Sequence, residues 1–183
     1  MSDLIIVSGG RGVGKTTFCR TVVKSAQHAG WRVAGVLSPA VFERGSKVAI
    51  AVEDISSGER RMLARLPVAG VAEGGIRTPG WVFDEQTLQW ADEALARVAS
   101  CDLLVVDELG PLEIERGQGW VHGLTALDKG EYRLALVVVR PELVGIARQH
   151  WRQAECIELK HQQDISNALE QVTRYWRQND INF

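Results

Sequence analysis

Residues 9–16 read Gly9-Gly10-Arg11-Gly12-Val13-Gly14-Lys15-Thr16, which matches the pattern G-x-x-x-x-G-K-[ST] in full. Glycines at these positions allow the backbone to curl around an anion with its N–H groups directed inward. The lysine can reach the β- and γ-phosphates of a nucleotide, and the threonine hydroxyl that follows can bind Mg²⁺. The stretch therefore predicts a phosphate-binding loop (the Walker A motif), with a catalytic role for Lys15 and a metal-binding role for Thr16.

The flanking residues have the patterns that such a loop requires. Leu4–Val7 is a short apolar run rich in β-branched residues, which predicts a buried strand. Residues Thr16–Ala29 predict a helix that ends at Gly30, and the positive end of its dipole would face the bound anion. We accordingly assign nucleotide binding to Gly9, Gly10, Arg11, Gly12, Val13, Gly14, Lys15, Thr16 and Thr17, and leave Thr17 out of the metal site.

The amino-acid composition limits the classes of protein to which this chain can belong. The chain has 183 residues, 45% of them hydrophobic, which predicts a single domain over residues 1–183 with a substantial core. A net charge of −2 argues against a broad nucleic-acid surface. No apolar run approaches the roughly 18 residues of a membrane span, and the N-terminus has no signal-peptide pattern. We expect a cytoplasmic protein that binds neither membrane nor nucleic acid.

Neither the cysteines nor the histidines form a recognisable metal or disulfide pattern. The three cysteines, Cys19, Cys101 and Cys156, are widely spaced and include no C-x-x-C pair. We expect all three to be small buried side chains in a reducing compartment. The four histidines share no metal-ligand spacing.

Strand-like and helix-like segments alternate, which predicts an α/β three-layer sandwich of the P-loop NTPase type with a mainly parallel sheet. Lys47–Glu53 and Arg60–Leu66 flank a turn at Ser56–Gly58 and predict an antiparallel hairpin inserted into that sheet. Residues 67–83, rich in glycine and proline, predict a loop near the active site. The other expected strands are 32–37, 103–106, 134–139 and 156–159, and the other expected helices are 84–99, 120–127, one beginning at Pro141, and one capped by Asp164.

The second half of a nucleotide site follows the apolar run Leu103–Val106, which ends in Asp107 and Glu108. This is a Walker B pattern. We predict that Asp107 holds Mg²⁺ through water, since Mg²⁺ keeps several waters and uses few protein carboxylates. Glu108 is the candidate general base that orients and deprotonates the attacking water. The absence of an Asn-Lys-x-Asp motif argues against a small GTPase.

Several short segments resemble the thermostable, cancer-related nucleoside-triphosphatase family. They are residues 35–39 (Gly-Val-Leu-Ser-Pro), residues 77–84 (Arg-Thr-Pro-Gly-Trp-Val-Phe-Asp), and residues 107–113 (Asp-Glu-Leu-Gly-Pro-Leu-Glu). The last is similar to an extended Walker B that commonly reads Asp-Glu-Ile-Gly-Lys-Met-Glu. The resemblance implies an Mg²⁺-dependent hydrolase that acts slowly on several nucleoside triphosphates, such as ATP or GTP, and it implies phosphate, metal and water roles for the residues assigned above.

The chain departs from that family where cations are common. Pro111 stands where the family commonly has lysine, Gly80 where its loop often has a basic residue, and Ala40 and Phe42 replace a Glu and an Arg. Each lost cation could have stabilised charge on the γ-phosphate. The candidate substitutes are Arg11, Arg77 and Arg116. Trp81, where the family often has tyrosine, either packs in the protein or stacks on a base.

The sequence therefore predicts hydrolysis of a nucleoside triphosphate to a diphosphate and phosphate. Two alternatives stay open. The first is a nucleotide-dependent adaptor or switch that binds a protein partner and hydrolyses little, which the missing cations favour. The second is a small-molecule or nucleotide kinase, for which residues 67–83 would be the lid, although they offer only Arg77 as a lid arginine.

Overall fold

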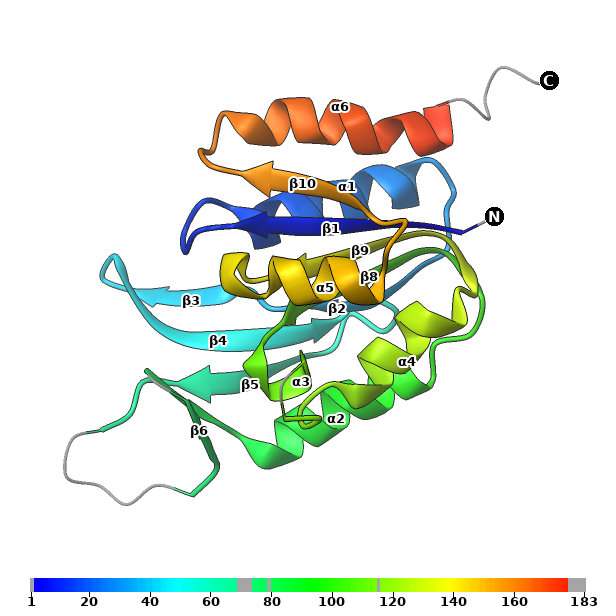
Figure 1. Cartoon of the computed structure of the whole chain (residues 1–183). Helices are drawn as coiled ribbons and strands as arrows, with labels where there is room; N and C mark the ends of the chain where they lie inside the picture. The colour runs from blue at the N-terminus through cyan, green and yellow to red at the C-terminus, as the bar shows by residue number, and fades with distance from the viewer. Residues whose placement is uncertain (1, 69–73, 79, 115, 178–183) are drawn as a thin grey trace.

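A computed structural model describes residues 2–68, 74–78, 80–114 and 116–177 (Figure 1). In chain order its elements are β1 (Asp3–Gly9), α1 (Lys15–His28), β2 (Val33–Leu37), β3 (Ala40–Glu43), β4 (Ser46–Asp54), β5 (Arg60–Arg65), β6 (Ile76–Thr78), β7 (Trp81–Phe83), α2 (Glu85–Ala96), β8 (Cys101–Leu109), α3 (Pro111–Ile114), α4 (Val121–Lys129), β9 (Tyr132–Val139), the 3₁₀ turn η1 (Pro141–Leu143), α5 (Val144–His150), β10 (Glu155–Leu159) and α6 (Asp164–Arg177).

The strands form a mixed sheet in the order β10-β1-β9-β8-β2-β4-β5-β7-β6, with β3 paired to β4. Strands β10, β1, β9, β8 and β2 are parallel, and β4, β5, β7 and β6 continue the sheet in antiparallel pairs. The parallel half confirms the predicted fold class. The pairing of β4 with β5 confirms the predicted inserted hairpin.

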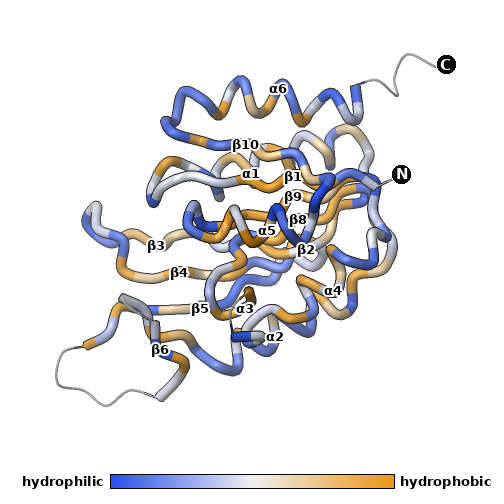
Figure 2. Tube along the Cα trace, in the orientation of Figure 1, coloured by the Kyte–Doolittle hydropathy of each residue, from blue (hydrophilic) through white to orange (hydrophobic). Residues whose placement is uncertain are grey.

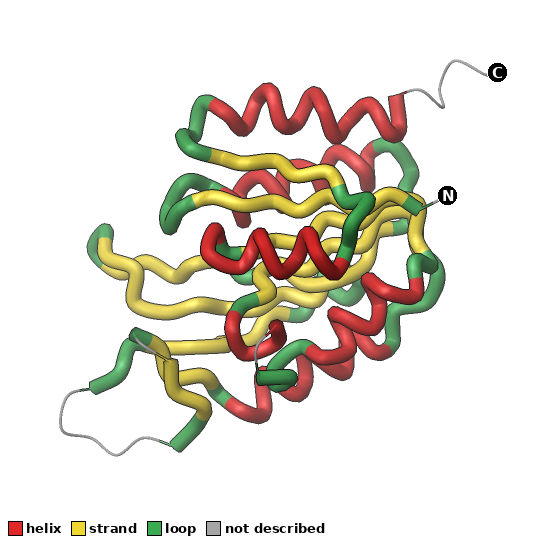
Figure 3. The backbone as a smooth tube through the Cα atoms, viewed as in Figure 1, coloured by secondary structure: helices red, strands yellow, loops and turns green. Residues whose placement is uncertain are grey.

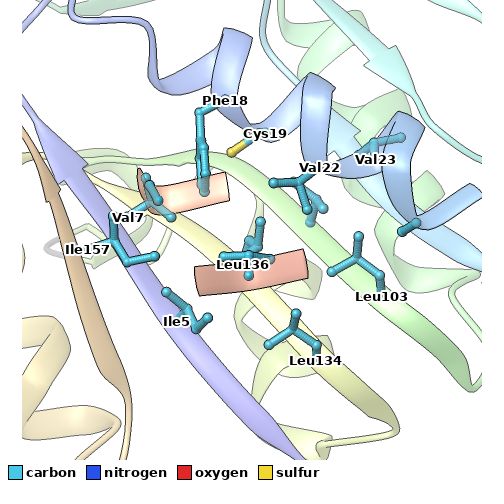
Figure 4. Packing of buried hydrophobic residues seen from close by; sticks show 14 of the residues in the cluster. Ile5, Val7, Phe18, Cys19, Val22, Val23, Leu103, Leu134, Leu136 and Ile157 are labelled. Atoms are coloured by element: carbon cyan, nitrogen blue, oxygen red, sulfur yellow. The ribbon is translucent and has the colours of Figure 1, made fainter. Parts of the chain in front are cut away.

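Helices cover both faces of the sheet (Figure 3), and hydrophobic residues predominate along its central strands (Figure 2). Alternate residues of β1, β8 and β9 divide between two cores. On β1, Ile5 and Val7 face α1 and α6, while Ile6 faces the side covered by α2, α4 and α5. Figure 4 shows Phe18 and Val22 of α1 packed over the strand residues of the first core. Burial on both faces explains why the parallel strands are continuous apolar runs.

The carboxyl ends of the parallel strands lie at one edge of the sheet, and this edge positions the site. The phosphate loop follows β1, Arg140 follows β9, Asp107 and Glu108 lie in β8, and Ser38 follows β2. Strand β4 is antiparallel to β2, with Leu37 paired to Glu53, so residues of β4 that precede Glu53 extend beyond the end of β2. The β3–β4 hairpin therefore projects past the same edge (Figure 1).

Part of the predicted loop over residues 67–83 is wrong. Ile76–Thr78 and Trp81–Phe83 are short antiparallel strands that extend the sheet from β5, whereas residues 69–73 and 79 lie outside the described part of the chain. Strands of three residues are too short to show an alternating pattern, and the surrounding glycines and prolines favoured a loop. Strand β3 was also not predicted, since four residues give little periodicity.

The helix predictions differ from the structure mainly at their ends. Asp84 caps α2 by accepting a hydrogen bond from the Thr87 N–H at 2.7 Å, but the helix ends at Ala96 rather than Ala99. Pro141 begins a 3₁₀ turn that passes into α5. None of the helices in the described residues is long and apolar enough to cross a membrane.

One cysteine prediction is wrong. Cys19 and Cys101 are buried, as expected, but Cys156 is exposed. It lies in β10, the last strand at its edge of the sheet, where Ile157 and Leu159 point into the core. Side chains alternate along a strand, so Cys156 faces outward.

Gly35 offers a direct test of the β2–β8 pairing. Its φ is +115°, and a Cβ at this position would lie 1.9 Å from the carbonyl oxygen of Val105. We expect Gly35→Ala to lower the free energy of unfolding in urea by more than about 2 kcal/mol, because both strain and overpacking oppose it. Gly58→Ala is the control, since Gly58 has φ +73° but no atom near the added methyl. Equal losses in the two variants would contradict the predicted close strand contact.

Candidate active site

The phosphate loop joins β1 to α1, and its lysine is held against the loop itself. The Lys15 ammonium donates hydrogen bonds to the carbonyl oxygens of Gly9, at 2.7 Å, and Gly10, at 3.1 Å. Gly14 caps α1 in the left-handed conformation, with φ 101°. The nine residues predicted to bind nucleotide thus lie where β1 ends and α1 begins. Thr16 and Thr17 belong to the first turn of α1, and the side chain of Val13 packs against the first core.

Asp107 is a buried carboxylate at the centre of the site, only 1% exposed. Its Oδ2 accepts a hydrogen bond from the Ser38 N–H at 3.1 Å, and the Ser38 hydroxyl donates to the Asp107 carbonyl oxygen. The Thr16 hydroxyl lies near the Asp107 carboxylate and favours its charged form. These contacts join the ends of β2, β8 and α1, and they bring together the two residues predicted to hold metal.

The environment of Asp107 favours its protonated form. Burial raises the pKa of Asp107 from 3.8 to about 6, and the negative charge of Glu108 acts in the same direction. The hydrogen bonds from Ser38 and Thr16 and the charge of Lys15 oppose that rise. A cation placed against this carboxylate would offset the cost of its buried charge.

Glu108 follows Asp107 at an irregularity of the sheet. Between Val106 and Leu109 the register of β8 shifts against β9, where the paired residues are Val137 and Val139. Such a bulge redirects side chains locally. Contrary to the prediction that the strand ends at Val106, β8 continues through the acidic pair to Leu109.

Arg140 holds the Glu108 carboxylate. Its Nε donates to Glu108 Oε1 at 2.8 Å, and both side chains are 31% exposed. Arg140 directly follows β9, which lies between β1 and β8 in the sheet. Its position immediately after the apolar run 134–139 was the signal that could have identified it, because the carboxyl ends of parallel strands meet at one edge.

A second buried carboxylate fixes the segment after Glu108. Glu113, 6% exposed, accepts hydrogen bonds from the Gly110 N–H at 2.8 Å and the Trp120 N–H at 3.2 Å. Burial raises its pKa, and the two backbone hydrogen bonds oppose that rise. Glu113 thus ties the start of α3 to the start of α4 and limits the movement of the backbone beside Glu108.

Lys47 of β4 brings a further cation to the same edge. Its ammonium lies 4.9 Å from the centre of the Trp81 ring. Desolvation lowers the pKa of Lys47, with Arg11 and Lys15 acting in the same direction and the two carboxylates, Asp107 and Glu108, acting against it. Lys47 therefore interacts electrostatically with the predicted catalytic residues, although its place in a surface hairpin gave no sequence signal for this role.

The three arginines proposed from the sequence as substitute cations are differently placed. Arg11 is exposed in the phosphate loop, and its charge acts on Lys47. Arg77 lies in β6, and Arg116 is exposed beyond α3. Trp81 is only 9% exposed, which favours packing over base stacking.

The residues present fit a magnesium site of the P-loop kind. The described residues contain no group of three or more His, Cys, Asp and Glu side chains that could hold a metal by themselves. A hydroxyl and a single buried carboxylate, joined in Thr16 and Asp107, are hard oxygen ligands. They suit an ion that takes its other ligands from water and substrate phosphates.

Sequence similarity relates the chain to a known family. The sequence profile of the NTPase family matches residues 4–163. The chain belongs to this family. A nucleoside-triphosphatase THEP1 of Methanopyrus kandleri is 30% identical over 115 residues, covering 63% of this chain and 62% of the relative. That of Thermococcus kodakarensis is 30% identical over 148 residues, covering 76% of this chain and 78% of the relative. The similarity to the first relatives thus spans about three-fifths of their length.

Solved structures support the same fold. The solution structure of a human cancer-related nucleoside triphosphatase superposes with a TM-score of 0.72 and 20% identity, covering 94% of this chain and 96% of that one. The crystal structure of THEP1 from Aquifex aeolicus gives a TM-score of 0.64 and 19% identity, with coverage of 92% and 96%. Both likenesses show the fold of this chain at low sequence identity.

The raised pKa of Asp107 predicts a specific pH dependence of stability. Between pH 4 and 6 the folded protein retains a proton that the unfolded chain releases, so this group's contribution to stability falls as the pH rises and levels off above about pH 7. Asp107→Asn removes the effect. We expect its stability relative to the natural protein to increase by on the order of 2 kcal/mol from pH 4 to pH 7.5, measured by urea unfolding with a chelator present. A difference that does not change with pH would contradict this.

Proposed function

We propose that this protein binds a nucleoside triphosphate at Gly9–Thr17 and hydrolyses it to a diphosphate and phosphate. The observation that carries the proposal is the convergence of Lys15, Thr16, Asp107 and Glu108 at the carboxyl edge of the parallel sheet. Slow turnover and broad base specificity, with ATP and GTP both accepted, belong to the proposal because the family resemblance implies them. The names of the THEP1 relatives are consistent with this activity.

In the proposed complex the loop N–H groups and Lys15 hold the phosphates, and Thr16 and Asp107 hold Mg²⁺. The ion, when bound, neutralises phosphate charge and orients the γ-phosphate. The fit rests on the nearness of the Thr16 hydroxyl to Asp107 and on the buried carboxylate, whose charge a cation would offset. Asp107 is proposed to hold the ion through water rather than to act as the base, and its Oδ2 already accepts a hydrogen bond from the Ser38 N–H.

Glu108 is the proposed general base. A water O–H bond breaks as its proton passes to the Glu108 carboxylate, while the water oxygen forms a bond to the γ-phosphorus. The bond from the γ-phosphorus to the bridging oxygen breaks, and its electron pair stays on the departing diphosphate. The Arg140 hydrogen bond occupies Oε1, which leaves Oε2 available to the water.

The proposal also covers the surroundings of this site. The chain acts as one domain, since both cores pack against the same sheet. A cytoplasmic location suits the free thiols of Cys19, Cys101 and Cys156. A protein partner is compatible with the proposal but is not required for the chemistry described.

Glu108→Gln tests the assignment of the base. We expect it to lower phosphate release at saturating Mg·ATP by at least about 100-fold, because the amide cannot accept the proton. Nucleotide affinity, measured by calorimetry, should change little. Glu93→Gln, on the exposed face of α2, is the control and should retain full activity. Phosphate release by Glu108→Gln at the natural rate would exclude Glu108 as the base, and none from the natural protein with any nucleoside triphosphate would overturn the proposed function.

Lys47 supplies the proposed cation at the γ-phosphate. The substitution Lys47→Gln should lower kcat by roughly 100-fold, the usual effect of removing one preorganised donor to developing charge. Lys24→Gln, which removes an exposed lysine from α1, is the matched control for net charge. Steady-state kinetics of both variants with Mg·ATP would decide. Equal activity of the two variants would show that Lys47 makes no contribution.

A further inference from the structure

Arg140 belongs to neither Walker motif, yet it makes an ion pair with the candidate base. The residue directly follows β9, the strand between β1 and β8, so it lies between the phosphate loop and the acidic pair. Its guanidinium Nε donates to Glu108 Oε1 at 2.8 Å. This contact couples the candidate base to an element that carries none of the Walker residues.

The backbone of Arg140 is well fixed. It is extended, with φ −65° and ψ 148°, as expected for a residue that precedes proline. Its carbonyl oxygen accepts a hydrogen bond from the Leu143 N–H at 2.9 Å, which closes the 3₁₀ turn after β9. The base of the side chain is therefore set by β9 and by Pro141, and only the side-chain torsions remain to be ordered.

Glu108, the other member of the ion pair, is also restrained. A Cβ added at Gly110 would lie 3.8 Å from Arg140 Nε, so the guanidinium packs close to that backbone. Glu113 fixes the same segment through the Gly110 N–H. The Glu108 carboxylate thus has its main chain restrained by Glu113 and its Oε1 restrained by Arg140.

We propose that Arg140 is a positioning residue for Glu108 in the hydrolytic step. This inference rests on the proposed function. An arginine keeps its charge at working pH and accepts no proton, so it cannot replace the base. By binding one carboxylate oxygen it directs the other toward the water. Its effect on the reaction passes entirely through Glu108.

Because Arg140 acts only through Glu108 in this proposal, its role can be distinguished from a direct contact with the γ-phosphate. If Arg140 acts through Glu108, its loss matters only while the carboxylate is present, and the two substitutions are not additive. If Arg140 touches phosphate, its loss costs the same factor in either background. Single-turnover kinetics with labelled nucleotide can measure the slow variants.

The experiment compares Arg140→Gln, Glu108→Gln and the double variant in the whole chain. We expect Arg140→Gln to lower kcat by about 10- to 100-fold with KM for Mg·ATP changed less than about twofold, and to cause no further loss beside Glu108→Gln. Arg140→Lys should restore part of kcat, because it returns the charge without the Nε geometry. Arg148→Gln, on the exposed surface of α5, is the control and should be fully active.

Three results would overturn the proposal. Multiplied losses in the double variant would show that Arg140 acts on the nucleotide directly. A raised KM with unchanged kcat would make it a binding residue only. A fall in kcat that follows the loss of folded protein, seen by urea unfolding, would make its role structural. A natural protein that releases no phosphate would instead reject the proposed function, and Arg140's role with it, whereas the preceding results leave hydrolysis intact.

Discussion

The burial of Asp107 is the constraint on which the rest of the site depends. A carboxylate that is 1% exposed must find hydrogen bonds or cations, and the structure supplies them from three elements. Ser38 follows β2, Thr16 lies in the first turn of α1, and Asp107 itself lies in β8. Satisfying this one group therefore fixes the relative placement of two strands and the phosphate-loop helix. The raised pKa of Asp107 means that the protein alone does not compensate the charge fully, which is the condition in which a bound cation stabilises the fold.

The order of the strands in the sheet then determines which other residues lie near Asp107 and Glu108. Inserting β9 between β1 and β8 places Arg140 beside Glu108, and the antiparallel extension places Lys47 beyond the end of β2. Gly80 and Pro111 stand where the family that the chain resembles commonly has basic residues. Positive charge nevertheless reaches the edge of the sheet from other elements. The same fold thus carries a different distribution of cations around the proposed site.

The sequence predicted the parts of the molecule that have long or strongly constrained patterns. Three features were recognisable: the phosphate loop, the apolar strands buried on both faces, and the acidic pair after Val106. Each combines a motif or an apolar run with a clear hydrophobic pattern in the residues beside it. The short strands β3, β6 and β7 were not, since three or four residues carry little periodicity. Cys156 was wrongly placed because an edge strand exposes alternate side chains.

The cations were the hardest residues to predict. Arg140 and Lys47 belong to no motif, and the roles proposed for them depend on which strands are neighbours in the sheet. The arginines suggested from the sequence were chosen by nearness to motifs, and two of them, Arg77 and Arg116, lie outside the elements that carry the acidic pair and the phosphate loop.

The most direct test of the proposed site is a crystal structure with a non-hydrolysable nucleoside triphosphate and Mg²⁺. The account predicts the triphosphate in the loop, the ion between Thr16 and Asp107, and a water between Glu108 and the γ-phosphate. A γ-phosphate directed away from the acidic pair would contradict it.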